Sequence, residues 1–483
     1  MNIAEYRLLR TDGKRSVLTE YRSQLIDKLA QNVCSGIIGN KNTLEKIPEP
    51  QSAFPVVEMQ EAFLVSRFLT KNGDHVGCHI YLEFVVEDLD MIRLQSSWKS
   101  VVDRHMMLRV KIGEDGTQQV LDVANADSFQ LHRPGIGKDV YQVRKEMSGK
   151  VYEPGQWPLF EIQVTQKDEL YYVVHFSIDE WIADGPSVSV ILEDWYKIYH
   201  GRLDTLREIK SHFKHYVDTV GSRRDDCLRQ KQLDYWYAKL SNIPNIYQSE
   251  QMLEIKFDRA QLRVRHVKHV GDDVWERLKK RCKDISISPT CLLLSIYSMV
   301  IREMERKRRL PISVTISNRL PVVDDVDKFV GPFMETALFL VDDYDGKTLS
   351  STLQSHQRQV WADLEHGLVS GIAVLRNLKW KKRIDRGYSI PFVFTSMLGN
   401  FNRNSDTWFA SNSYFITQTP QVYLDHQVYE KDGQLVLNWD VVPAIFKVGS
   451  VDEHIGRYMD MLNQLSLKSV SWNKVVLKDG FIF

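Results

Sequence analysis

Residues 174–187, VHFSIDEWIADGPS, contain the pattern that decides the fold. An apolar run meets an acid at Asp179, and after four intervening residues a second acid, Asp184, is followed by a Gly-Pro turn. The run from 169 to 178 predicts a buried strand, and the apolar spacing after Asp184 predicts a helix. Carboxylates in such a segment must cap, pair or hold a proton, because an isolated buried charge is costly.

The two acids differ in how readily a structural role explains them. Asp184 stands immediately before a helix that begins with Gly-Pro, so its side chain can cap the free backbone N–H groups, a role worth about 1 kcal/mol. Asp179 ends an apolar strand and has no such ready explanation. The residues by themselves support a functional site and a structural role equally.

Length and composition describe an ordinary globular protein. The 483 residues are 43% hydrophobic and 26% charged, which predicts two domains or subdomains with large cores. Lys+Arg and Asp+Glu both number 63, so we expect no nucleic-acid binding through bulk charge. The five cysteines form no CxxC pair, no metal-ligand cluster is visible, and no apolar run reaches membrane-spanning length. We therefore expect a cytoplasmic protein with reduced thiols, no metal and no membrane partner.

The chain divides into three parts. Residues 1–50 contain an amphipathic helical pattern and a linker, and they form either an appended helix or a docking element for a neighbouring module. Residues 51–240 and 250–483 each mix helices and strands, with a polar hinge between them. This pattern predicts a mixed α/β (α+β) fold with two halves of similar size.

Seven segments, in order, resemble the motifs of the condensation-domain superfamily of nonribosomal peptide synthetases. The spacing Asp179-x4-Asp184-x2-Ser187 is similar to the signature of its heterocyclization branch. Six further segments resemble the other motifs, with Pro332 and Met334-Glu335 as departures from the commoner residues: 54–67, 104–109, 314–319, 330–342, 391–398 and 418–427.

The resemblance implies a fold and a partner chemistry. It implies two chloramphenicol-acetyltransferase-like subdomains in a V-shaped pseudo-dimer, with a central tunnel at their junction. Upstream and downstream peptidyl or aryl carrier proteins of adjacent modules would each bring a substrate on a 4'-phosphopantetheine arm, with no cofactor bound by the chain itself. The implied enzyme condenses an acyl or peptidyl thioester with carrier-bound Cys, Ser or Thr, and then cyclodehydrates the amide to a thiazoline or oxazoline.

Asp425 is the first candidate catalytic residue. In the strand PQVYLDHQV it alternates with apolar residues, so it projects from the polar face of that strand. Periodicity alone also fits a solvated acid on an outer sheet face. The resemblance implies that Asp425 acts in cyclodehydration together with Thr395 of the preceding FTS motif, a residue that otherwise simply suits a strand.

Three further residues are expected to support the site. Asn318 is a candidate for hydrogen bonding to the substrate amide, although turn chemistry before Leu-Pro explains it equally. Gln421 is expected to orient Asp425 or the substrate. Arg319, at a strand end, is expected to pair with Asp184 across the junction, which would make Asp184 and Ser187 structural.

Two other functions stay open at this point. One is a condensation domain that forms the amide without cyclization. The other is a catalytically silent module that docks carrier proteins. The presence of both Asp425 and Thr395 favours cyclization.

Overall fold

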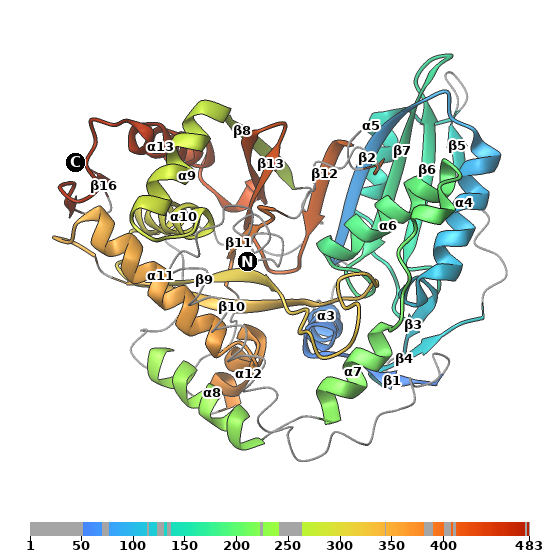
Figure 1. The fold of residues 1–483 in the computed structure, drawn as a ribbon, viewed down its shortest axis with the longest axis horizontal. Coiled ribbons are helices and arrows are strands. Elements are labelled where there is room, and N and C mark those ends of the chain that lie inside the picture. Colours follow the sequence, from blue (N-terminus) through green and yellow to red (C-terminus); the bar gives the residue numbers. More distant parts are fainter. Residues whose placement is uncertain are drawn as a thin grey trace.

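The computed structural model places helices and strands in alternation along the chain, as the sequence predicts (Figure 1). The predicted helix at 17–33 and nearly all of the predicted hinge at 240–252 lie outside the described residues. The structure describes residues 52–69, 77–113, 115–122, 130–132, 137–222, 226–240, 263–342, 344–380, 390–399, 407–408, 412–478 and 481–482.

The N-terminal half is built on a five-stranded sheet with the order β12-β2-β7-β6-β5. Phe84 and Phe176 on one face of this sheet pack against Trp98 and Trp195 of helices α4 and α6. Tyr81 lies on the opposite face and packs with residues of α5. The elements of this half are β1 (Phe54–Pro55), α3 (Glu58–Leu69), β2 (His79–Glu87), α4 (Met91–Arg104), η1 (Met106–Arg109), β3 (Val110–Ile112), β4 (Thr117–Val120), β5 (Gln130–His132), α5 (Val140–Met147), β6 (Phe160–Gln166), β7 (Tyr171–Asp179), α6 (Gly185–Tyr199), η2 (Leu203–Thr205), α7 (Phe213–Ser222) and α8 (Asp226–Leu240).

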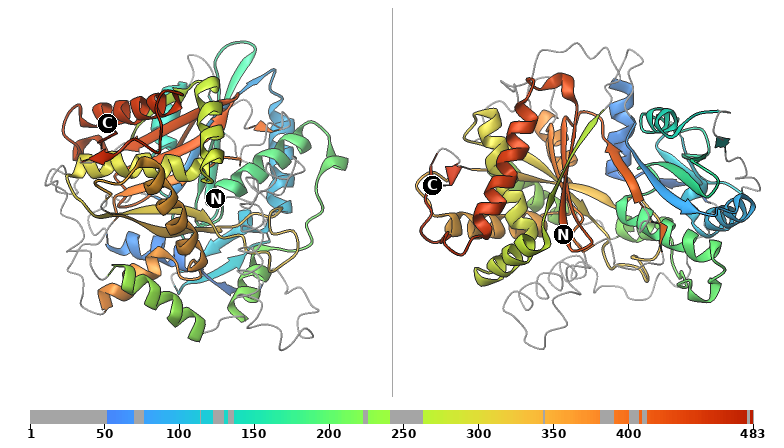
Figure 2. Two further views of the ribbon diagram at one scale, coloured as in Figure 1. Left: turned by 60° about the vertical axis from the view of Figure 1, so that its left-hand side comes forward. Right: turned by 90° about the horizontal axis from the view of Figure 1, so that it is seen from above.

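The C-terminal half is built on a six-stranded sheet with the order β10-β9-β11-β13-β14-β8. Helices α9, α10, α11 and α13 share one apolar core with this sheet, and Figure 2 shows α9, α10 and α13 along its outer side. The elements are β8 (Val264–Val270), α9 (Asp272–Asp284), α10 (Pro289–Glu305), β9 (Leu310–Ser317), β10 (Met334–Val341), α11 (Leu349–Glu365), α12 (Gly371–Trp380), β11 (Phe392–Ser396), β12 (Asn412–Gln418), β13 (Leu424–Lys431), β14 (Gln434–Val441), η4 (Pro443–Ile445), α13 (Ser450–Ser466), β15 (Leu477–Lys478) and β16 (Phe481–Ile482).

Several segments of the described chain cross from one half to the other. Strand β12 comes late in the chain but pairs antiparallel with β2 at the edge of the N-terminal sheet. Four apolar residues between β9 and β10 join the N-terminal core: Val326, Phe329, Val330 and Phe333. Helix α8 packs against β10 and α12 of the C-terminal half. These crossings fix the two sheets relative to each other.

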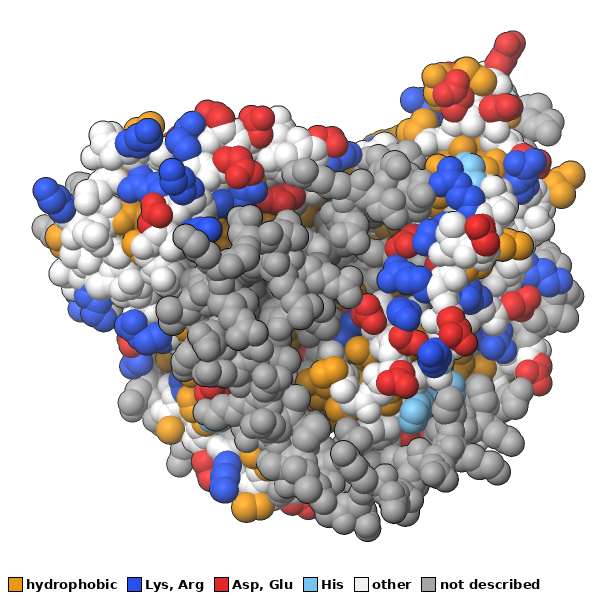
Figure 3. Space-filling view, viewed as in Figure 1, with side chains coloured by type: hydrophobic (Ala, Val, Ile, Leu, Met, Phe, Trp, Pro, Cys, Tyr) orange, Lys and Arg blue, Asp and Glu red, His pale blue; other side chains and the backbone are white. Residues whose placement is uncertain are grey.

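The surface matches the balanced composition. On the face drawn in Figure 3, Lys and Arg side chains are interspersed with Asp and Glu side chains on both halves. Within the described residues no single helix is long and apolar enough to span a membrane; only α9 and α10 taken together, bent by 102°, meet the length and composition. Nearly every residue of α10 is buried inside the molecule.

Candidate active site

A cavity of about 410 Å³ lies between the two sheets. The N-terminal half lines it with residues of α3, β2 and the start of α6, and the C-terminal half with residues of β9, β10, α12, β11 and β13. Strand β12 adds Phe415 and Thr417. Both Asp425 and Thr395 line the cavity, so the structure brings the two predicted catalytic residues to one place.

Asp425 points into this cavity because of the alternation of β13. Leu424 and Val428 belong to the core under the helices, and His426 packs against Tyr297 there. Asp425 and Gln427 therefore face the opposite side, where the cavity lies. The prediction that the acid occupies the polar face of its strand is confirmed, but this face is enclosed: only 6% of Asp425 is exposed.

The Asp425 carboxylate has defined partners. Its Oδ2 accepts hydrogen bonds from Thr417 Oγ1 at 3.0 Å and from Gln427 Nε2 at 2.8 Å. Burial raises the pKa of Asp425, and the negative charge of Asp440 raises it further, whereas Gln427, Arg263 and Thr417 act in the opposite direction. The result is a carboxyl group whose pKa is shifted toward neutrality, as proton transfer requires.

Thr395 lies on the neighbouring parallel strand β11, in register with Gln427 and two residues beyond Val393, which pairs with Asp425. Its Oγ1 is 3.5 Å from Asp425 Oδ1, at the outer limit of a hydrogen bond, and donates to Thr315 Oγ1 of β9 at 3.0 Å. The side chains of three adjacent strands, β9, β11 and β13, thus form a row of hydroxyl, hydroxyl and carboxyl groups along the cavity wall.

A second layer of charge lies behind this row. Arg265 of β8 binds both carboxylate oxygens of Asp440 at 2.6 and 2.5 Å, and donates to Gln427 Oε1 at 3.0 Å. Asp440 faces Asp425 directly across the β13–β14 pair. Arg265 therefore pairs with Asp440 and orients Gln427, which in turn donates to Asp425. No local pattern in the sequence indicates this layer, because it joins strands far apart in the chain.

Gln421 lines the cavity, whereas Asn318 is not among the described residues that line it. Gln421 lines the cavity at the turn before β13, with a left-handed φ of 63°. Asn318 is held through its backbone: its N–H donates to Phe333 O at 2.8 Å, and its carbonyl accepts from Tyr216 at 2.6 Å. Among the described residues, the cavity lining includes Ser317 and does not extend to Asn318. A substrate contact by either side chain stays a prediction.

Asp184 and Asp179, the two acids of segment 174–187, both have structural contacts. Asp184 caps α6 by accepting the Ser187 N–H at 2.9 Å, and its Oδ1 also lies 2.9 Å from Arg319 Nη2. The predicted Arg319–Asp184 pair is present and buried. The Ser187 hydroxyl accepts from Arg319 and from the Gly331 N–H, which ties α6 to the C-terminal half. Asp179 accepts the Trp181 N–H at 2.9 Å in the turn after β7.

Glu180 is a cavity residue that the sequence analysis missed. It lies between Asp179 and the cap of α6, is 6% exposed, and lines the cavity. Its Oε2 is 2.6 Å from the Cys78 thiol, and its backbone N–H donates to Cys78 O at 2.8 Å. The available signal was a third acid within the same short buried segment.

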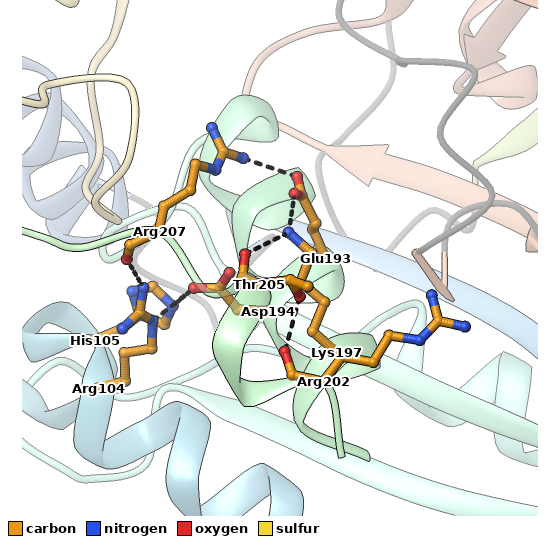
Figure 4. Close-up of polar contacts among 8 residues, drawn as sticks. All are labelled: Arg104, His105, Glu193, Asp194, Lys197, Arg202, Thr205 and Arg207. Atoms are coloured by element: carbon orange, nitrogen blue, oxygen red, sulfur yellow. Dashed lines mark hydrogen bonds and ion pairs between the residues drawn. The ribbon is translucent and has the colours of Figure 1, made fainter. Parts of the chain in front are cut away.

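His105 occupies a charged cluster on the outside of the N-terminal half (Figure 4). Its Nε2 lies 3.2 Å from Asp194 Oδ2, and Arg104 Nε donates to the same oxygen at 2.7 Å. Burial lowers the pKa of His105, while Asp194 acts in the opposite direction. Ion pairs of Glu193 with Lys197 and Arg207 continue the cluster along α6. His105 therefore helps to join α4 to α6 and has a structural role.

Cysteine and metal chemistry are limited within the described residues. Cys78, Cys282 and Cys291 are buried free thiols, and Cys227 is exposed. No group of three or more His, Cys, Asp or Glu side chains in the described residues is placed to hold a metal ion.

Comparison with known proteins identifies relatives across most of the chain. Residues 50–471 match the family model described as Condensation domain. The chain is 28% identical over 430 residues to bacitracin synthase 1 of Bacillus licheniformis, covering 85% of this chain and 8% of that protein. It is 27% identical over 438 residues to pyochelin synthetase PchF of Pseudomonas aeruginosa, covering 88% of this chain and 24% of that protein. The chain thus spans less than a quarter of the length of either relative.

A solved structure is similar over nearly the whole length. The EpoB NRPS cyclization-docking bidomain from Sorangium cellulosum superposes with a TM-score of 0.80 and 26% identity, covering 96% of each chain. The observed pair of mixed α/β halves is the fold that the sequence motifs predicted.

Proposed function

The chain belongs to the condensation-domain family, and from this premise we propose that it is a heterocyclization domain of nonribosomal peptide synthesis. It joins a carrier-bound acyl or peptidyl thioester to the amino group of carrier-bound Cys, Ser or Thr. It then removes water from the new amide to form a thiazoline or oxazoline. The observation that carries this proposal is the Asp425–Thr395 pair inside the cavity between the two halves.

The relatives support the cyclization branch. The chain is similar to a cyclization-docking bidomain over 96% of its length and to a pyochelin synthetase over 88%. It also has the Asp179-x4-Asp184-x2-Ser187 spacing of that branch. The similarity to a bidomain that includes docking supports the further proposal that residues 1–50 dock a neighbouring module.

The cavity contributes positioning. Carrier proteins, one upstream and one downstream, each insert a 4'-phosphopantetheine arm, so that the thioester and the amino group meet at the junction of the halves. Holding both reactants there converts an encounter into a near-intramolecular step, which can supply up to ~7–11 kcal/mol of the barrier. The arms belong to the carriers, and the chain itself contributes the walls.

Asp425 contributes proton transfer during ring closure. The side-chain thiol or hydroxyl attacks the amide carbon, and Asp425 accepts the proton that this group loses. The C–O bond then breaks as the oxygen takes that proton and the amide N–H proton, leaving as water while the C=N bond forms. Thr395, next to Asp425 on β11, supplies a hydrogen bond to the departing oxygen. Burial raises the pKa of Asp425, which favours the uptake of a proton by this carboxylate.

The test is a reconstituted reaction with two loaded carrier proteins, followed by product mass. We expect an amide that then loses one water. An amide that keeps its water would establish the alternative of condensation without cyclization. No product with any of the three acceptor amino acids would leave only the alternative of a silent docking module.

The variant Asp425→Asn separates the two chemical steps. We expect amide formation within about tenfold of the wild-type rate and water loss slowed by at least about 100-fold, since general acid–base catalysis typically contributes that much. Thr395→Val is expected to slow the same step to a smaller extent. The rates of appearance of amide and of heterocycle are measured separately by mass spectrometry. Equal loss of both steps in Asp425→Asn would remove Asp425 from the assigned role.

A further inference from the structure

Glu180 is a buried cavity carboxyl group that the cyclodehydration mechanism does not use. It stands at the C-terminal end of β7, on the N-terminal half, whereas Asp425 and Thr395 come from the C-terminal half. The two acids therefore reach the same cavity from different halves of the chain.

The structure holds Glu180 firmly in this position. Cys78, at the start of β2, accepts the Glu180 N–H through its carbonyl and donates its thiol to the Glu180 carboxylate. Burial and the charge of Glu180 raise the pKa of Cys78 far above the usual range, so the thiol keeps its proton and remains a donor. The Cys78 sulfur also lies 3.9 Å from Thr419 Oγ1, which ties this pair to the segment that leads into β13.

The neighbouring acids of the segment have other tasks. Asp184 is bound by Arg319 and caps α6, and Asp179 shapes the turn through the Trp181 N–H. Both are almost fully buried and, with Asp425, they surround Glu180 with negative charge.

We propose that Glu180 is the catalytic residue of the first step, the group that moves the proton from the acceptor's amino nitrogen to the departing sulfur during amide formation. The inference rests on the proposed function and divides its two steps between the two walls of the cavity. Glu180 serves the formation of the amide, and Asp425 with Thr395 serves the loss of water.

The step balances as a proton shuttle. The neutral amine attacks the thioester carbonyl carbon, and the Glu180 carboxylate takes one N–H proton as the C–N bond forms. The C–S bond then breaks, and the Glu180 acid returns that proton to the pantetheine thiolate. The products are an amide and a thiol, and Glu180 ends as the carboxylate with which it began.

The acidity of Glu180 suits this exchange. Burial and, to a smaller extent, the charges of Asp179, Asp425 and Asp184 raise its pKa to about 8, while the hydrogen bond from Cys78 acts in the opposite direction. The nitrogen becomes positively charged, and therefore acidic, as the C–N bond forms. A carboxylate whose conjugate acid has a pKa of about 8 then accepts its proton, and the resulting acid returns a proton to the thiolate.

The experiment measures the two steps separately in the full chain. Glu180→Gln is incubated with the two loaded carrier proteins and, in a second reaction, with a carrier that already bears the uncyclised N-acylcysteinyl amide. We expect amide formation to slow by at least about 100-fold, whereas water loss from the preformed amide stays within about threefold of wild type. Asp425→Asn should show the opposite pattern in both reactions. Glu87→Gln, at the exposed end of β2, is the matched control and should behave as wild type in both.

Further controls separate a loss of catalysis in Glu180→Gln from a loss of folding. Circular dichroism and thermal unfolding establish whether Glu180→Gln is folded, and Glu180→Asp, which keeps the carboxyl group but sets it back by one methylene, replaces it if it is not. Glu180→Asp should restore part of the amide-forming rate and must remain slower than wild type.

The outcomes distinguish this inference from the function on which it rests. Amide formation at the wild-type rate in Glu180→Gln would refute the role of Glu180 and leave the proposed function intact. A folded Glu180→Gln that loses both steps equally would also refute it, because a residue of the first step has no direct part in the second. A wild-type chain that forms no amide would refute both proposals.

Discussion

At the scale of single residues, burial raises the pKa values of two carboxyl groups that line the cavity. Asp425 and Glu180 line it directly, and their pKa values are raised mainly because a charged carboxylate loses its hydration there. Glu335 of β10, one of the departures from the family motif, also has a raised pKa, although it is not among the described residues that line the cavity. Burial and the nearby charge of Glu58 raise its pKa to about 8, and its Oε2 has no hydrogen-bond partner among the described residues.

The raised pKa of Glu335 predicts how the stability of the protein depends on pH. The folded state keeps the Glu335 proton up to about pH 8, whereas the unfolded chain releases it near the ordinary value of 4.5. The free energy of unfolding therefore falls as pH rises between these values, and this contribution is present in full only below about pH 4.5. We expect Glu335→Gln to be more stable than wild type at pH 8 by roughly 1–3 kcal/mol, with the difference vanishing toward pH 4.5.

Urea unfolding at several pH values measures this difference. Glu87→Gln, which alters an exposed side chain on β2, should show no such trend. A Glu335→Gln curve parallel to that of wild type across the whole range would show that the folded protein does not hold this proton.

At the scale of elements, the start of α6 joins the two halves. Asp184 caps the helix and meets Arg319 of the segment after β9, while Arg319 also donates to the carbonyl groups of Val326 and Phe329. One short polar cluster thus fixes the helix start, the turn after β9 and the loop before β10. This arrangement explains the buried acid of the sequence as a structural group, with no need for a chemical role.

The buried ion pair predicts that Asp184 and Arg319 contribute to the free energy of unfolding in a coupled way. Asp184→Asn keeps an equally good helix cap but leaves the buried Arg319 charge unpaired. Removing one partner of a buried pair typically costs about 3–5 kcal/mol, so we expect a loss of that size in the free energy of unfolding. The double variant Asp184→Asn/Arg319→Met should recover part of it, because it also removes the unpaired charge. Additive effects in this double-mutant cycle would show that the pair contributes no coupling.

At the scale of the whole molecule, the cavity exists only because the halves are interlocked. Strand β12 lies in the N-terminal sheet, yet its Thr417 donates to Asp425 in the C-terminal sheet, and its Phe415 packs on Arg265 at 4.7 Å. The carboxyl group proposed to drive ring closure is therefore oriented by a strand of the opposite half. Any motion between the sheets would change the contacts of Asp425.

Because both steps are proposed to take place in one cavity, a side chain that blocks the cavity is expected to slow both. Ser189, on the first turn of α6, lines the cavity. Ser189→Trp places a large side chain where both substrates must meet, so we expect amide formation and water loss to fall together by at least about tenfold, since positioning supports both. Ser96→Trp, on the exposed face of α4, is the control. If Ser189→Trp impaired only one step, the two reactions would not share this space.

The sequence by itself determined the local structure and the family. Apolar spacing predicted strand β7 and helix α6, and the Asp before Gly-Pro predicted the cap of α6. The motif order predicted the fold, and an otherwise unexplained arginine at a strand end predicted the pairing of Asp184 with Arg319. These features depend on residues close in the chain or on a recurring pattern. Alternation along β13 also placed Asp425 on the correct face.

Only the tertiary structure decided which groups surround that acid. Thr417 from a crossed strand, the Arg265–Asp440 pair behind Gln427, and Glu180 with its Cys78 partner on the opposite wall do not follow from any local pattern. Their proximity depends on how two sheets pack, and the raised pKa of each buried acid depends on the water that this packing excludes. Periodicity fixes the face a side chain occupies, and packing fixes what that face meets.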